Sequence, residues 1–307
     1  MPLHPKIAAI LEHMRTKGAK PTYQMTAQEA RKHLASLPRS KAKEPVATQD
    51  RNVANFRVRI YTPEAKKPLP ILLYFHSGGW VIGDLEMADA RCHLLAKETP
   101  CIVISVDYRL APEHRFPAAV EDAFAATEWA YVHARELGGD PEKIAVGGES
   151  SGGNLAAVVA LLAREKGSPP IVFQWLIYAG FDADFSRASY QKFGHDYFLE
   201  KESMTWCWHH YLPKEEERKN PYASPLHAKS LKGLAPAYIA TAEYDILLDE
   251  GNAYAERLKK EGVPVRTKCF QGMVHSFLIW MDVVPEIRQN FQEMIEELRR
   301  GFRNLSQ

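Results

Sequence analysis

The sequence has no excess of positive or negative charge, because its 39 lysines and arginines are balanced by 38 aspartates and glutamates among 307 residues. A basic surface that attracts nucleic acid or an anionic membrane is therefore not expected. No apolar run approaches membrane-spanning length, and the first residues lack the basic and apolar stretches of a secretory signal. These absences predict a soluble, cytoplasmic protein that binds a small and roughly neutral molecule.

Cysteine is scarce as well. The four cysteines lie far apart, at positions 92, 101, 207 and 269, and form no C-x-x-C pair. Neither a zinc site nor a disulfide framework therefore has a signal in the sequence. We expect free thiols in a reducing compartment and no bound metal.

Strand patterns alternate with helical patterns from about residue 56 onward. Several of the strands are continuously apolar, which is typical of strands buried on both faces, and helices such as 117–136 and 155–166 lie between them. The expected strands cover residues 56–61, 71–75, 101–106, 144–147, 171–177, 237–241 and 265–270. The sequence therefore predicts an α/β fold, with a mostly parallel central sheet flanked by helices.

Two segments fall outside this alternation. Residues 1–45 show two short helical patterns, and the second begins at a capping box, Thr26-Ala27-Gln28-Glu29. Residues 182–225 form an aromatic-rich insertion in a gap that is too long for a single crossover. We expect these two segments to form a helical cap over one end of the sheet, while residues 46–181 and 226–307 form the main domain.

The stretch GGESSGGN, residues 147–154, follows an expected strand and precedes an expected helix. A phosphate-binding loop is excluded there, because neither G-x-G-x-x-G nor a terminal Gly-Lys-Ser/Thr can be read. The pattern G-x-S-x-G fits once and centres on Ser150, since Glu149 occupies the position where Ser151 would need glycine. Glycines are expected around a nucleophile at such a turn, because side chains two residues on either side would collide.

A serine hydroxyl needs a base to remove its proton and an acid to orient that base. Asp245 and His275 both come just after later strands, in the order that follows Ser150 in enzymes with this turn. Asp249 and Glu250 are alternatives for the acid, but we expect them to be charges that cap the next helix. Asp245 is therefore the predicted acid and His275 the predicted base.

An apolar strand upstream ends in His76-Ser77-Gly78-Gly79. This stretch resembles the HGGG-type loop whose backbone N–H groups stabilise an oxyanion in lipases and esterases. Glycine lets such a backbone approach a substrate closely. The N–H groups of Gly78, Gly79 and Ser151 are the predicted oxyanion donors, so Ser151 would contribute its backbone rather than its hydroxyl.

The motifs HSGGW, DYRLAPEHRFPAAVEDA, GGESSGGN, YDILLDEG and GMVHSF share one order and spacing with a known family. The chain resembles, over nearly its whole length, the bacterial hormone-sensitive-lipase-like esterases, the family IV carboxylesterases of the α/β-hydrolase fold. The resemblance implies the same triad and oxyanion hole, a cap, short- to medium-chain acyl esters as substrates, and no cofactor. It also implies that Asp107 and Arg109 brace the end of the sheet.

Four positions depart from the family pattern, and none of them removes a catalytic atom. Ser77 replaces the first glycine of HGGG, and Glu149 replaces the aspartate before the nucleophile. Ile246 replaces a proline after the acid, and Ser276 replaces the glycine after the histidine. Ser77 matters most, because its side chain can restrict the oxyanion loop and change substrate preference.

Several alternatives stay open at this point. An amidase or arylformamidase would use the same triad, whereas a non-catalytic receptor on this fold would lack the histidine that is present here as His275. Trp206 and Tyr211 could line an acyl pocket or form the core of the cap, and we favour the core. Homologues often pair through a sheet edge and the last helix, but the pattern from 284 to 302 shows no decisive apolar outer face, so a homodimer stays open.

Overall fold

The computed structural model describes residues 2–303, and its centre is a twisted sheet. Within these residues the sheet has eight strands in the order β1-β2-β4-β3-β5-β6-β7-β8. The strands are β1 (Ala47–Val53), β2 (Phe56–Thr62), β3 (Leu69–Phe75), β4 (Ile102–Asp107), β5 (Gly139–Glu149), β6 (Ile171–Ile177), β7 (Ala237–Tyr244) and β8 (Val265–Val274). All pairs from β4 to β8 in this order are parallel, and β1 and β2 form an antiparallel edge, so the predicted mostly parallel sheet is confirmed.

Strand β1 was not among the strands expected from the sequence. Its seven residues, ATQDRNV, are largely polar, and only the last of them is buried. An edge strand exposed on both faces needs no apolar pattern, so the sequence gives no signal for it. Its place is determined by its antiparallel pairing with β2, in which Ala47 lies opposite Thr62.

The two faces of the sheet carry separate hydrophobic clusters, which explains the continuously apolar strands. In β3, Ile71, Leu73 and Phe75 belong to one cluster, and the alternate residues Leu72 and Tyr74 belong to the other. Side chains of a strand alternate between faces, so a strand covered on both sides must be apolar at nearly every position. The expectation that these strands are buried on both faces is confirmed.

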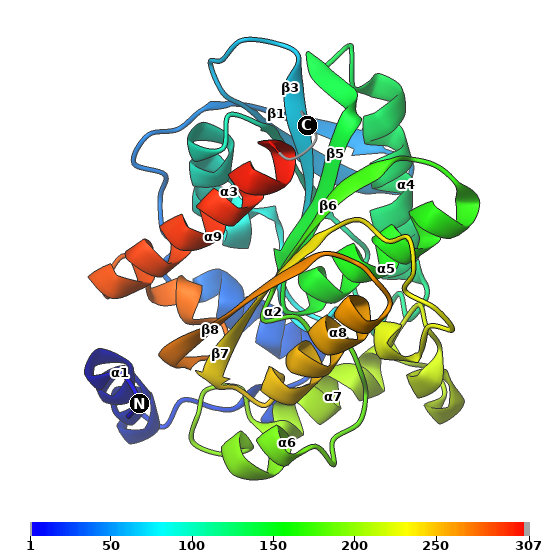
Figure 1. Ribbon diagram of the computed structural model, residues 1–307. Coiled ribbons are helices and arrows are strands. Elements are labelled where there is room, and N and C mark those ends of the chain that lie inside the picture. Colours follow the sequence, from blue (N-terminus) through cyan, green and yellow to red (C-terminus); the bar gives the residue numbers. More distant parts are fainter. Residues whose placement is uncertain (1, 304–307) are drawn as a thin grey trace.

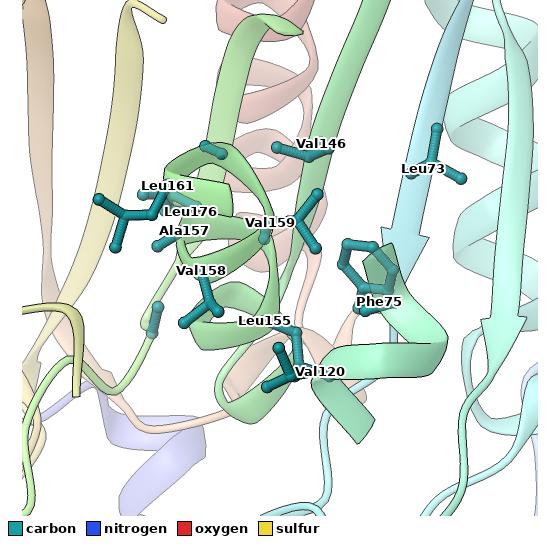
Figure 2. Close-up of a cluster of buried hydrophobic side chains, with 14 of the residues drawn as sticks. Leu73, Phe75, Val120, Val146, Leu155, Ala157, Val158, Val159, Leu161 and Leu176 are labelled. Carbon is teal, nitrogen blue, oxygen red and sulfur yellow. The ribbon is translucent and has the colours of Figure 1, made fainter. Parts of the chain in front are cut away.

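Helices cover both faces, as Figure 1 shows. Helices α3 (Leu85–Glu98) and α9 (Pro285–Arg303) lie on one side, and α4 (Ala118–His133), α5 (Ser151–Lys166) and α8 (Leu248–Lys260) lie on the other. In Figure 2, Leu155 and Val159 of α5 lie near Phe75 of β3 and Val120 of α4. This packing fixes the start of α5 against the end of β3.

The remaining helices lie in the lower half of Figure 1, with α2 behind the strands. They are α1 (Pro5–Thr16), α2 (Ala27–Ser36), α6 (Ala188–Phe193) and α7 (Lys201–Tyr211), with short 3-10 turns at Thr22–Gln24, Glu215–Lys219, Pro225–His227 and Phe277–Trp280. Helix α2 begins with the predicted capping box between Thr26 and Glu29. No described helix has the length and apolar character needed to cross a membrane.

Arginine side chains fasten α2 and the segment after it to the main domain. Arg31 donates from Nε to the carbonyl of Val81 at 2.8 Å and from Nη2 to the carbonyl of Ala111 at 2.7 Å. Arg39 makes a two-fold ion pair with Asp84, with both distances at 2.8 Å. Because a guanidinium donates in a fixed fork, these contacts define the position of α2 beside the loop after β3.

Candidate active site

Ser150 lies between the last residue of β5 and the first residue of α5. Its backbone angles, φ 54° and ψ −121°, belong to a region that non-glycine residues rarely adopt. Its N–H donates to the carbonyl of Ile177 at 2.9 Å, and its carbonyl accepts from the N–H of Asn154 at 3.0 Å. The surrounding backbone therefore holds Ser150 in a strained conformation at a sharp turn.

The glycines of this turn are required by close backbone contacts. A Cβ atom on Gly148 would lie 2.6 Å from the carbonyl carbon of Gly152, and a Cβ on Gly152 would overlap the carbonyl of Phe75. A Cβ on Gly153 would lie 2.5 Å from the Cβ of Ala179. The expected collision across the turn is thus confirmed, and the strand-to-helix connection can be this tight only with glycine.

Ser150, His275 and Asp245 meet at the carboxyl ends of β5, β8 and β7. Nε2 of His275 lies 2.9 Å from Oγ of Ser150, and Nδ1 of His275 lies 2.7 Å from Oδ2 of Asp245. A carboxylate only accepts, so Nδ1 is the donor and Nε2 is free to accept the serine hydroxyl. All three side chains are buried, which strengthens the electrostatic interactions among them.

Asp245 is itself oriented by its own loop, because its Oδ1 accepts from the N–H of Leu247 at 2.9 Å. The alternative acids bind elsewhere. Asp249 accepts from the N–H of Ser189 at 2.7 Å, and Glu250 accepts from the N–H groups of Phe181 and Asp182. Asp249 and Glu250 lie in the first turn of α8, as expected, and their carboxylates also tie a neighbouring segment to this helix.

Glu250 differs from the other acids in this region by its complete burial. Burial raises the pKa of its carboxyl group to about 8, against the hydrogen bonds from two backbone N–H groups that lower it. Oε1 of Glu250 also accepts from the hydroxyl of Tyr190 at 3.3 Å. These contacts hold the chain after β6 against α8, close to the loop that carries Asp245.

The loop after β3 turns through two glycines in left-handed conformations, Gly78 at φ 123° and Gly79 at φ 60°. Nδ1 of His76 lies 2.7 Å from the carbonyl of Ser77, so this nitrogen carries a proton and donates it. The C=O and N–H of one trans peptide point in opposite directions, and the N–H of Gly78 therefore points away from His76. Among residues 2–303, no group accepts from the N–H of Gly78 or Gly79.

A third N–H is available at the start of α5. Ser151 is the first residue of the helix, and the first N–H groups of a helix have no partner within it. The hydroxyl of Ser151 is buried and unpartnered among the described residues. This agrees with a contribution from the backbone of Ser151 rather than from its side chain.

Helix α7 packs directly against the loop after β3. A Cβ atom on Gly79 would overlap Sγ of Cys207, and the rings of Trp80 and Tyr211 stack with centroids 4.3 Å apart. Trp208 also contacts Trp80, with centroids 4.5 Å apart. Tyr211 therefore belongs to an aromatic core between α7 and this loop.

Trp206 lies on another side of α7. It is partly buried against Val81 and Ala111, and its ring meets the ring of His210 edge-on at 4.4 Å. These contacts join α7 to the loops after β3 and β4. Trp206 therefore also packs between elements.

Glu149, whose presence the sequence leaves unexplained, is buried at the end of β5. Its carboxylate accepts from the hydroxyls of Tyr74 and Tyr178 and from Nε of Arg91 at 2.8 Å. Sequence reasoning missed these three partners. The two tyrosines could have been found from the sequence, because each lies at the end of an otherwise apolar strand. Arg91 lies within a helix, where no local pattern indicates such a role.

The predicted bracing residues and cysteines lie outside the triad. Arg109 makes a two-fold ion pair with Asp122, and Asp107 pairs with Arg57 at 3.2 Å, so both hold the chain after β4. The four cysteines are free, as expected. In the described part of the chain, no group of three or more histidine, cysteine or acidic side chains is arranged to hold a metal ion.

Comparisons with known proteins agree with this geometry. Residues 72–279 match a family model described as the α/β hydrolase fold. The carboxylic ester hydrolase LipN of Mycobacterium tuberculosis is 43% identical over 247 residues, which cover 78% of this chain and 66% of LipN. The ethyl acetate hydrolase of Pseudomonas putida is 35% identical over 98% of this chain and 99% of that relative.

A solved structure gives the same result. The crystal structure of a thermostable esterase from Pseudomonas putida has a TM-score of 0.92 to this chain at 36% identity, and the match covers 98% of both chains. The expected fold and the resemblance to esterases are both confirmed. This chain belongs to the α/β-hydrolase fold family, in the branch of hormone-sensitive-lipase-like esterases.

Proposed function

We propose that the protein is a carboxylesterase that hydrolyses short- to medium-chain acyl esters through an acyl-enzyme on Ser150. The observation that carries this proposal is the continuous set of hydrogen bonds from Asp245 through His275 to Ser150. The esterase names of the relatives support the reaction, and the ethyl acetate hydrolase among them supports a small acyl group.

The geometry supports the following steps. Nε2 of His275 takes the proton of Ser150 as Oγ attacks the ester carbonyl carbon, and Asp245 stabilises the imidazolium that forms. The carbonyl oxygen becomes an oxyanion held by the N–H groups of Gly78, Gly79 and Ser151, each worth a factor of about 10²–10³ in rate. The imidazolium returns its proton to the leaving alkoxide. An acyl group then remains on Oγ.

Hydrolysis of the acyl-enzyme repeats these roles with water. His275 removes a proton from the water as its oxygen attacks the acyl carbon, and the same proton then restores the Ser150 hydroxyl. The products are a carboxylic acid and an alcohol. The side chains named here supply every proton transfer that this sequence of steps requires.

Residues 1–45 and 182–225 form the proposed cap over this site. The packing of α7 on Gly79 and Trp80 supports this role, because it brings the cap into contact with an oxyanion donor. The burial of Ser150 and His275 supports it as well, since substrate must enter beneath covering segments. A covered site excludes water other than the hydrolytic molecule and favours small acyl groups.

Replacement of Ser150 by alanine tests the reaction. We expect Ser150→Ala to lose about 10⁴-fold or more in kcat/KM against a ladder of p-nitrophenyl esters, because the nucleophile is absent. Ser224→Ala is the matched control, since Ser224 is also buried and its hydroxyl has no partner among the described residues. Full esterase activity of the Ser150→Ala variant would contradict the proposal.

A second measurement separates esters from amides. Wild-type protein is given a butyrate ester and the corresponding butyramide, and the two kcat/KM values are compared. We expect the ester to be the better substrate by several orders of magnitude. Faster turnover of the amide would assign the site to an amidase, and turnover of neither, with the folded protein present, would favour a binding protein.

A further inference from the structure

Glu149 joins a buried ion pair to two tyrosines behind the nucleophile. Its Oε1 accepts from Nε of Arg91 at 2.8 Å and from the hydroxyl of Tyr74, and its Oε2 accepts from the hydroxyl of Tyr178 at 2.5 Å. Glu149 is 1% exposed and the Arg91 side chain 8%, so the pair is screened from water. Removal of a buried carboxylate with three donors lowers the stability of the fold, because each donor would be left without a hydrogen-bond acceptor.

One of the two tyrosines reaches the triad. The ring of Tyr178 meets the imidazole of His275 edge-on, with centroids 5.1 Å apart and an interplanar angle of 63°. Tyr178 adopts φ 34°, which is unfavourable for a residue with a side chain, and its N–H donates to the carbonyl of Ala240 at 2.7 Å. Its backbone is therefore fixed by the sheet, and the carboxylate of Glu149 fixes the far end of its ring.

The other tyrosine provides a comparison within the same cluster. Tyr74 donates to the same carboxylate and is also buried, but it belongs to β3, and among the described residues its ring makes no aromatic contact with His275. Both hydroxyls anchor Glu149, and Tyr178 alone of these two lies against the base.

We propose that Glu149 is a positioning residue that, through Tyr178, holds the imidazole of His275 at the angle required for proton transfer from Ser150. The role rests on the proposed function, because it assigns His275 as the base. Glu149 also directly precedes Ser150, so the residue that anchors Tyr178 is the neighbour of the nucleophile in the chain. A misplacement of about 1 Å in such a pair is enough to slow the chemical step.

The charges around Glu149 determine how the pH profile should respond to its loss. The ionisable groups facing the carboxylate are Tyr74, Arg91, Cys92, Tyr178 and His76. Burial raises the pKa of the tyrosines and of Cys92 and lowers that of His76, so these groups stay neutral. Burial lowers the pKa of Arg91, but Glu149, Tyr74 and Tyr178 together outweigh burial and keep this pKa raised, so Arg91 stays charged.

The groups facing His275 are Asp245, Ser150 and the ring of Tyr178. Glu149→Gln would leave the positive charge of Arg91 unbalanced behind that ring. A positive charge disfavours a second one on the imidazole, so the acid limb of kcat/KM should move to lower pH in this variant.

The deciding experiment compares Tyr178→Phe with Tyr74→Phe. Each variant removes one hydroxyl from the same carboxylate, and each keeps its ring. We expect Tyr178→Phe to lower kcat about tenfold with KM changed less than twofold, and Tyr74→Phe to keep kcat within twofold of wild type. Glu149→Gln should lower kcat like Tyr178→Phe and move the acid limb; if it does not fold, the tyrosine pair still decides.

Labelling by a fluorophosphonate probe separates this role from the proposed function. Labelling of wild-type protein at Ser150 supports the triad, and labelling elsewhere or not at all overturns it. If wild-type protein is labelled at Ser150 but Tyr178→Phe and Tyr74→Phe have equal kcat values, the positioning role is overturned and the esterase assignment stands. If Tyr178→Phe and Tyr74→Phe lose the same stability but only Tyr178→Phe has a lower kcat, the positioning role is supported.

Discussion

The loop after β3 and the loop after β8 each place a buried histidine at the same end of the sheet, in different surroundings. His76 is 0% exposed, and its Nδ1 donates to the Ser77 carbonyl while its Nε2 is unpartnered among the described residues. His275 is 4% exposed and lies between a carboxylate and a hydroxyl. Burial is shared by both, so the difference that allows proton transfer is the nearby countercharge.

His76 shows what burial does without such a partner. Burial lowers the pKa of His76 below its ordinary value of 6.5, and its ring stacks on Tyr108 with centroids 4.2 Å apart. The hydroxyl of Tyr108 donates to the carbonyl of His76 itself at 2.8 Å. His76 is therefore a neutral side chain that shapes the loop after β3, whereas His275 has the carboxylate of Asp245 beside it, which favours a positive charge on the imidazole.

The largest expected effect comes from giving His275 the surroundings of His76, without a countercharge. Asp245→Asn removes the countercharge and leaves the shape of the side chain, so we expect kcat to fall about 10⁴-fold with the fold retained. Asp249→Asn is the control, because among residues 2–303 the side chain of Asp249 accepts from the N–H of Ser189 and from no other group. Steady-state kinetics with p-nitrophenyl butyrate measures both, and similar values for the two variants would argue against Asp245 as the acid.

A smaller effect is expected in the loop after β3. His76→Leu removes the donor to the Ser77 carbonyl and frees the peptide that carries the N–H of Gly78. We expect kcat to fall about 10- to 100-fold. This decrease is no larger than the decrease of about 10²- to 10³-fold that follows the removal of one oxyanion donor. His76→Asn keeps an N–H near the position of Nδ1 and should recover most of the rate; no difference between the two variants would contradict this role.

The pH dependence of stability gives the next effect. In the folded chain the pKa of His76 is lowered from its ordinary value of 6.5. Below about pH 6.5 the unfolded chain therefore binds a proton at His76 that the folded chain binds only at lower pH. The free energy of unfolding should therefore fall as pH decreases from 6.5, by at most about 1.4 kcal/mol per pH unit from this group. Urea unfolding at pH 7.5, 6.5 and 5.5 should show that the free energy of unfolding decreases less steeply in His76→Asn than in the wild type. Equal decreases in the two proteins would contradict a contribution of His76 to the pH dependence of stability.

The smallest effect concerns the left-handed residues of the two loops. In the loop after β3 they are Gly78, Gly79, Trp80 and Gly83, and in the loop after β8 Ser276 adopts φ 55° directly after His275. Relief of this strain in Ser276→Gly should raise the free energy of unfolding by about 0.5–1 kcal/mol. Thermal unfolding measures the change. Ser186→Gly, at an exposed position, is the control, and destabilisation by Ser276→Gly would show that its side chain contributes more than the strain costs.

Much of the fold follows from patterns that are local in the sequence. Strands β3, β4 and β6 are apolar at nearly every position because both faces are covered. The carboxyl ends of β5, β7 and β8 lead directly to Ser150, Asp245 and His275. Strand β1 has no such pattern because it is exposed. The positions of the site residues could therefore be predicted from strand ends, while the polar edge could not.

The contacts of Glu149 could not be predicted for a different reason. Its partners Tyr74, Arg91 and Tyr178 lie 75, 58 and 29 residues away in the sequence. Such a cluster depends on the register between neighbouring strands and on the rotation of α3 about its axis, and neither leaves a local signal. The same limit applies to Glu250, which has the position of a capping residue but bonds a distant segment.

The position of His275 after β8 has a consequence for how activity appears in a newly made chain. Strand β8 is the last strand in sequence and forms the edge of the sheet beside β7. During synthesis Ser150 and Asp245 emerge before His275, and domains generally fold as units once their residues are available. Under the proposed mechanism, ester hydrolysis during refolding therefore reports the docking of this last edge, and a chain ending before residue 265 would hold Ser150 without His275.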